Sequence, residues 1–216
     1  MCLTLAAFGC ASSLRTPPPL TVLASLPDDA SVDQILDAVR VRVRRCDDER
    51  DAKQRQALAV EAVQLAQHCV ARAPQSAACD YWLGISLGLQ AREKPTTAND
   101  GLEQMVAALR RAIERDAGYD HAGPHRVLAL VLLRAPGWPA GPGDPESGLM
   151  EARAALQLEP DYPPNLLAMA EALQKNGQGS ESSALVDELR QRLARLDPAT
   201  EPEVIRWRRD LSALER

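Results

Sequence analysis

One spacing recurs along the chain and limits what it can fold into. Small or apolar residues are separated by four and then three positions, and a helix-ending position follows five residues later. Steps of four and three place side chains along one side of an α-helix. A proline then ends the helix, because it lacks an N–H group and clashes with the preceding turn. The four copies are Ala62, Ala66, Cys69 and Pro74; Met105, Leu109, Ala112 and Ala117; Gly148, Ala152, Ala155 and Pro160; and, more weakly, Ser182, Val186, Leu189 and Ala194.

A second helical pattern alternates with the first. A large apolar residue is followed by a small one and, one turn later, by a leucine. The three copies are Leu83, Gly84 and Leu87; Leu128, Ala129 and Leu132; and Met169, Ala170 and Leu173. Together the two patterns resemble the tetratricopeptide repeat over residues 58 to 195, which implies an α-solenoid of helical hairpins. The alternative is a helical bundle with an alanine-rich core.

The composition agrees with an all-α fold. Apolar residues make up 45% of the chain and aromatic residues 3%, so the core must consist mainly of small and aliphatic side chains. Such side chains allow helices to approach closely. We expect a helical repeat domain over residues 31–216, and its last helix, 201–214, to cap the open end of the array. The expected helices are 32–45, 50–72, 77–91, 99–116, 123–134, 145–158, 163–175, 180–195 and 201–214.

The N-terminus resembles the end of a bacterial lipoprotein signal. Residues 1–10 are apolar and end in Gly9 and Cys10. The resemblance implies that Cys10 is lipidated, and Ala11 after it implies delivery to the outer membrane, facing the periplasm. Residues 11–30 are rich in proline and are expected to form a disordered tether. The alternative is a disordered N-terminus of a cytoplasmic protein.

Two connections between paired helices are longer than an ordinary repeat allows. They span residues 92–101 and 134–148 and should project from one edge of the array, which is often a binding surface. The second contains Trp138, which is either packed against the array or exposed as an anchor for a partner. We expect Trp138 to bind a protein or peptide partner, with Tyr81 and Arg126 bordering the same surface.

The segment from Ala135 to Pro160, continuing through Asn165 to Leu173, resembles a particular group of repeat proteins. These are the periplasmic T components of tripartite ATP-independent periplasmic transporters. The resemblance implies an accessory lipoprotein that works beside a solute-binding protein or binds a small ligand. This role is the alternative to a scaffold for protein–protein interaction, and a cavity lined by Trp82 would favour it.

No residue pattern indicates an enzyme, a cofactor or a metal. The chain has neither a Gly-x-x-x-x-Gly-Lys loop nor a nucleophile elbow, and Gly123 and Pro124 interrupt the spacing of His121 and His125. A net charge of −5 without a basic stripe argues against nucleic acid. Among Cys46, Cys69 and Cys79, the preferred disulfide is Cys69–Cys79; the alternatives are a bridge to Cys46 or three reduced, buried thiols.

Overall fold

The computed structural model describes residues 26–27 and 29–215 of the 216-residue chain. The predicted signal at residues 1–10, the lipidation site Cys10 and the predicted tether up to residue 25 lie outside the described residues. Within the described part, no helix is both long and apolar enough to cross a membrane.

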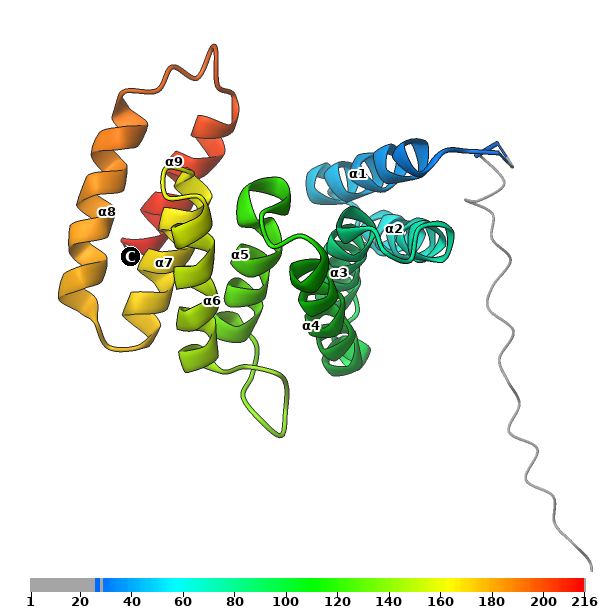
Figure 1. The fold of residues 1–216 in the computed structure, drawn as a ribbon, viewed down its shortest axis with the longest axis horizontal. Coiled ribbons are helices and arrows are strands. Elements are labelled where there is room, and N and C mark those ends of the chain that lie inside the picture. The colour runs from blue at the N-terminus through cyan, green and yellow to red at the C-terminus, as the bar shows by residue number, and fades with distance from the viewer. Residues whose placement is uncertain (1–25, 28, 216) are drawn as a thin grey trace, which may run out of the picture.

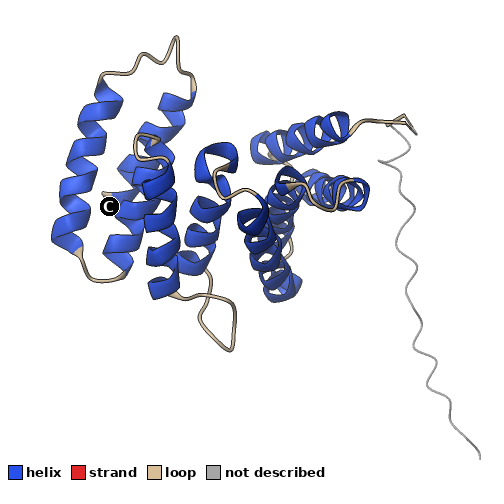
Figure 2. Ribbon diagram, in the orientation of Figure 1, coloured by secondary structure: helices blue, strands red, loops and turns tan. Residues whose placement is uncertain are grey.

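The described residues form an all-α array, as the sequence predicts (Figures 1 and 2). Consecutive helices pack as antiparallel pairs, α1 with α2, α3 with α4, α5 with α6, and α7 with α8. This arrangement is consistent with a helical repeat array. The helices are α1 (Val32–Asp48), α2 (Ala52–Arg72), α3 (Ala77–Glu93), α4 (Ala98–Arg115), α5 (Tyr119–Arg134), α6 (Pro145–Leu158), α7 (Pro163–Lys175), α8 (Gly179–Ala194) and α9 (Glu203–Leu214).

Side-chain caps fix the start of several helices. Ser31 accepts a hydrogen bond from the Gln34 amide, and the Gln34 side chain accepts one from the Ser31 amide, which makes a reciprocal capping box before α1. Asp144 caps α6 in the same region where the sequence predicts a helix start, and it accepts from the Ser147 amide at 3.1 Å. These caps supply acceptors for amides that have no partner inside the helix.

Glycine allows the paired helices to approach closely. A Cβ atom at Gly84 on α3 would lie 2.9 Å from Cγ of Leu109 on α4, and one at Gly148 on α6 would lie 2.8 Å from Cγ of Leu133 on α5. Leu109 is fully buried and Leu133 almost so, which leaves them little room to move. The small residues of the two sequence patterns therefore lie where neighbouring helices touch.

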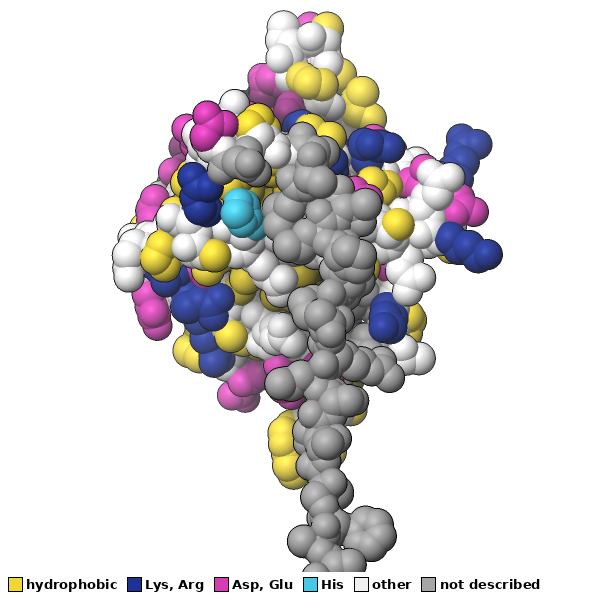
Figure 3. Space-filling model, turned by 90° about the vertical axis from the view of Figure 1, so that its right-hand side faces the viewer, with side chains coloured by type: hydrophobic (Ala, Val, Ile, Leu, Met, Phe, Trp, Pro, Cys, Tyr) yellow, Lys and Arg dark blue, Asp and Glu magenta, His cyan; other side chains and the backbone are white. Residues whose placement is uncertain are grey.

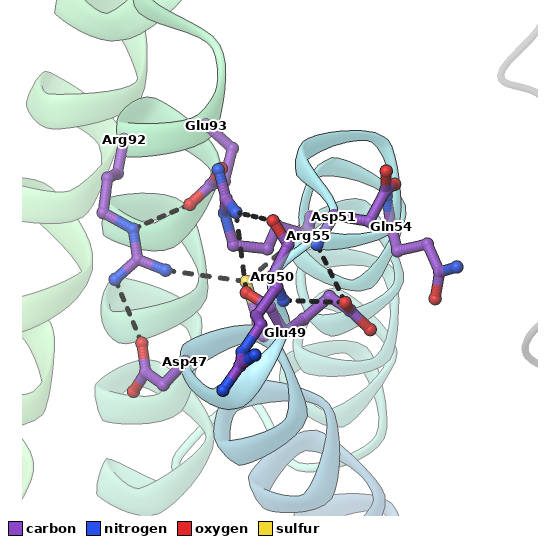
Figure 4. A network of polar contacts seen from close by, with 9 residues as sticks. Asp47, Glu49, Arg50, Asp51, Gln54, Arg55, Arg92 and Glu93 are labelled. Atoms are coloured by element: carbon purple, nitrogen blue, oxygen red, sulfur yellow. Dashed lines mark hydrogen bonds and ion pairs between the residues drawn. The ribbon is translucent and has the colours of Figure 1, made fainter.

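The first long connection, predicted over residues 92–101, is shorter than predicted and contains a 3-10 turn. Helix α3 continues to Glu93, a short 3-10 turn follows at Pro95–Thr97, and α4 begins at Ala98. A polar network explains the longer α3, because Arg92 and Glu93 bind residues at the α1–α2 turn (Figure 4). Arg55 donates to Glu93 at 2.9 Å, and Arg92 contacts Asp47 at 3.0 Å.

Cys69 and Cys79 form a disulfide between the end of α2 and the start of α3, with their Cα atoms 5.4 Å apart. This is the pairing that the sequence favours, and it leaves no partner for the competing bridge to Cys46. Cys46 is a free, buried thiol whose Sγ donates to the Arg55 carbonyl at 3.4 Å. Burial raises the pKa of this thiol, which keeps it in its neutral form.

Helix α9 packs on α7 and α8 at the C-terminal end of the array. Val204 is fully buried, and Leu211, Trp207 and Leu214 join the apolar cluster of α7 and α8. Ile205 on the same helix remains 64% exposed. The last helix therefore covers apolar surface of the final hairpin, as expected of a capping helix.

Candidate functional site

The three residues predicted to bind a partner do not share one surface. Trp138 is 90% exposed, whereas Tyr81 and Arg126 are buried, at 3% and 8% exposure. Arg126 lies in the first half of α5, and Trp138 follows the other end of that helix. Trp138 is therefore exposed, and Tyr81 and Arg126 belong to a different part of the molecule.

Tyr81 and Arg126 lie at a row of aromatic side chains that crosses the array at the start of α5. The row contains five of the six Trp and Tyr residues of the described chain: Trp82, Tyr81, Tyr119, Tyr162 and Trp207. The rings meet edge to face within two groups, Trp82 with Tyr81 and Tyr119, and Tyr162 with Trp207, with centroids 5.4 to 5.9 Å apart in the contacting pairs. This geometry suits the ring quadrupoles. We call these five residues the aromatic row.

The N-terminal half of the aromatic row connects α1, α3 and α5. The Trp82 indole N–H donates to the Tyr119 hydroxyl at 3.3 Å, and the Arg40 guanidinium donates to the same hydroxyl at 3.3 Å. Arg40 also lies 5.5 Å from the centroid of the Trp82 ring, within cation–π range. Trp82 and Tyr119 are only partly buried, so part of each side chain is open to solvent.

A left-handed turn lies in the middle of the aromatic row. Asp120, His121 and Ala122 have φ angles of 50°, 55° and 57°, which residues other than glycine rarely adopt. Arg126 holds this turn by donating to the His121 carbonyl at 2.9 Å, and Asn165 donates to the same carbonyl at 3.2 Å. Backbone of this kind persists only where surrounding contacts hold it, and it concentrates at functional sites.

The turn presents His121 to the C-terminal half of the aromatic row. The His121 and Tyr162 rings stack with centroids 4.4 Å apart, and the His121 side chain is still 57% exposed. Tyr162 in turn contacts Trp207 of α9, and the Arg126 guanidinium lies 5.0 Å from the Tyr162 ring centroid. Within the row, Tyr81 is buried, whereas Trp82, Tyr119, Tyr162 and Trp207 are each partly open to solvent.

Two hydroxyl groups of the aromatic row, those of Tyr81 and Tyr162, have raised pKa values. Burial, the negative charge of Asp120 and a hydrogen bond to it at 2.7 Å raise the pKa of Tyr81 far above its usual value. Burial also raises the pKa of Tyr162. These two hydroxyls therefore stay uncharged, and charged groups beside the row include Arg40, Asp120 and Arg126.

The Trp138 loop, residues 135–144, has a closed neck. The Gly143 amide donates to the Pro136 carbonyl at 2.8 Å, and the Asp144 amide donates to the Leu132 carbonyl at 2.9 Å. A Cβ atom at Gly141 would lie 2.7 Å from the Pro136 carbonyl oxygen, so the neck needs glycine there. In Figure 1 the loop projects at the lower edge, between α5 and α6.

The edge that carries the Trp138 loop also carries the start of α4, as the sequence predicts for the two connections. The Asn99 side-chain oxygen lies within 3.5 Å of the Cβ position at Gly141. Beside this contact is a cavity of about 370 Å³, lined by Glu103, Val106, Ala107, Arg110, Leu132 and Pro142. Trp82 does not line it, so the cavity that would favour the transport role is not this one.

The two histidines have separate acidic partners. His125 contacts Glu151 at 2.6 Å, and His121 lies 3.7 Å from Glu159. Within residues 29–215, no group of three or more His, Cys, Asp or Glu side chains is placed to hold a metal ion. On the face drawn in Figure 3, Lys and Arg side chains are interspersed with Asp and Glu.

The aromatic row could not be predicted from local sequence patterns, because its members lie as far apart in the chain as residues 81 and 207. One local signal was present: Tyr119 and Tyr162 each stand two positions after the helix-ending residue of a repeat, Ala117 and Pro160.

No protein-family model matches the chain, and no curated protein is significantly similar to it.

Proposed function

We propose that the protein is a non-catalytic helical-repeat scaffold that binds a protein or peptide partner along the aromatic row. The observation that carries the proposal is the row itself. Its rings form two groups, one around Tyr81 and one around Tyr162, and the Asp120–Arg126 ion pair joins them, because Tyr81 donates to Asp120 and Arg126 lies over the Tyr162 ring. Aromatic residues are enriched at binding hot spots because they bury a large area at a small cost in side-chain entropy.

The strained turn supports this role. Each residue in a left-handed conformation costs about 1–2 kcal/mol unless it is glycine, and here three occur in succession. The contacts of Arg126 and Asn165 offset the strain and keep His121 stacked on Tyr162 before any partner arrives, which reduces the entropy cost of binding.

We place this scaffold in the cell envelope. The Cys69–Cys79 disulfide is typical of an oxidising compartment, and residues 1–10 resemble a lipoprotein signal. We expect the protein to fractionate with membranes, and Cys10→Ser to release it into the periplasm. Wild-type protein that is soluble throughout fractionation would contradict the lipid anchor while leaving the aromatic row untouched.

Affinity capture from envelopes tests the binding role. His121→Ala and Tyr162→Ala each remove one ring at the row, and we expect each to weaken capture about 10-fold or more, the size of a hot-spot loss. Met150→Ala is the matched control, because Met150 is 62% exposed on α6 and lies outside the row. Equal capture by all three variants would contradict the proposal, provided that their circular dichroism spectra match the wild type.

A further inference from the structure

Trp138 is the most exposed large apolar side chain of the described residues, at 90% exposure, and backbone hydrogen bonds order the loop that carries it. The two neck hydrogen bonds, Gly143 to Pro136 and Asp144 to Leu132, close the loop beneath it. The Ala140 amide also donates to the Gly137 carbonyl at 3.0 Å within the tip. Leaving a large apolar side chain in water rather than burying it costs about 1.5–3 kcal/mol, so a loop built to present an indole suggests a binding partner.

The cavity beside the loop has the chemistry that an indole ring requires. Its apolar lining consists of the buried side chains of Val106 and Leu132, the exposed Ala107 and the half-buried Pro142. Arg110 supplies a cation for the face of the ring, and Glu103 supplies an acceptor for the indole N–H. Neither Arg110 nor Glu103 has an ion-pair partner within residues 29–215, so both side chains can bind a ligand. The cavity, about 370 Å³, lies near the small end of ligand sites, roughly 300–1,000 Å³, and therefore suits one side chain rather than a helix.

We infer that the cavity receives Trp138 of a second copy of this chain, and that two copies exchange their Trp138 side chains around a two-fold axis. Pro142 belongs both to the loop and to the cavity wall, so the donor and the acceptor adjoin on one surface. A two-fold dimer uses the same patch on both partners and requires this self-complementarity. A surface that recognises a different protein has no need to carry both halves of the contact.

The expected area sets the strength of this dimer. A Trp side chain buries up to about 250 Å², so two inserted indoles and the small accessible walls of the two cavities bury roughly 600 Å² in total. Interfaces of this size are weak and reversible. We therefore expect a dissociation constant on the order of 10–300 µM, with no requirement for the aromatic row at the other end of α5.

Sedimentation equilibrium of the full chain over that concentration range tests the inference. The wild type should dimerise, and Trp138→Ala should raise the dissociation constant at least about 100-fold, since two hot-spot contacts are lost per dimer. Ala107→Lys, at an exposed helical position on the cavity wall, should do the same. Ala57→Lys is the matched control, because Ala57 is likewise an exposed helical alanine but lies on α2, outside the cavity. It and Met150→Ala should leave dimerisation unchanged.

A mixture of two defective variants provides the decisive arm. Trp138→Ala retains its cavity and Ala107→Lys retains its tryptophan, so an equimolar mixture can form one of the two contacts. Native mass spectrometry should then find more heterodimer than either homodimer. A wild type that stays monomeric up to about 500 µM, a Trp138→Ala variant that dimerises normally, or a mixture without excess heterodimer would each overturn the inference. These outcomes leave capture by the aromatic row unaffected, so the two proposals fail independently.

Discussion

Arg126 should be the polar residue on which the centre of the array most depends. Arg126→Met keeps the length and the apolar stem of the side chain but removes every hydrogen bond from the guanidinium. The Asn165 side-chain oxygen loses a donor at 3.0 Å, and the Asp120 carbonyl loses contacts at 3.4 Å. The His121 carbonyl keeps its bond from the Asn165 amide.

The magnitude follows from the two acceptors left without a donor. An unsatisfied buried polar group costs about 1–3 kcal/mol, which gives roughly 2–6 kcal/mol for two. Asp120 is exposed, so water replaces part of its loss. We therefore expect Arg126→Met to lower the free energy of unfolding by about 3 kcal/mol. The loss should also free the three left-handed residues to relax.

Urea unfolding with hydrogen exchange is the assay. Amides of residues 119–123 should lose protection first in Arg126→Met, because the strained turn is no longer held. Arg190→Met is the control, since Arg190 pairs with Asp187 and Glu215 at the surface, and exposed ion pairs contribute little to stability. If both variants lose the same small stability, or if protection at 119–123 is unchanged, the reasoning about the turn is wrong.

Three further predictions concern the scaffold. Replacing Cys69 and Cys79 together by alanine should lower the free energy of unfolding by about 2.7 kcal/mol, from the loop entropy of a 10-residue separation, as measured by urea titration without reductant; an unchanged midpoint would contradict it. Gly84→Ala should destabilise the protein because its Cβ would crowd the facing leucine on α4, whereas Gly101→Ala, with ordinary contacts, should stabilise it by about 0.5–1 kcal/mol; equal thermal shifts would refute the close-approach argument. Burial raises the pKa of Glu93, but hydrogen bonds from its two arginines outweigh this and lower it. Glu93 therefore contributes stability above its unfolded pKa of about 4.3, and this contribution is lost as the pH falls through the lower folded pKa. Glu93→Gln should flatten this acid dependence, and an unaltered slope would count against the network.

The helical positions could be predicted from sequence because they depend on local signals. Spacing of four and three residues, N-caps such as Asp144 and terminators such as Pro160 act within one or two turns. The same signals placed a loop at residues 92–101, where Pro95 and Gly101 stand. In the structure α3 extends to Glu93, because residues at the α1–α2 turn form hydrogen bonds with its last residues.

The candidate site depended on information that no local pattern carries. The sequence has glycines at 118 and 123, where a left-handed backbone would be expected, yet the left-handed residues are the three that begin at Asp120. Their conformation depends on Arg126 and on Asn165, more than 40 residues away from the start of the turn. Likewise the sequence does not determine whether Trp138 is buried or exposed, because its exposure depends on how the loop folds.

Site-specific photo-crosslinking in cells tests the central claim, which is that the aromatic row binds a partner. A photoreactive phenylalanine analogue would replace Tyr162 in one variant, Tyr119 in a second and Met150 in a third. We expect the two row positions, which lie on different repeats, to cross-link to the same protein, and Met150 on α6 to give no such product. If the row positions give no cross-link, or if Met150 gives the same one, the aromatic row is packing within the array and the proposed binding function is wrong.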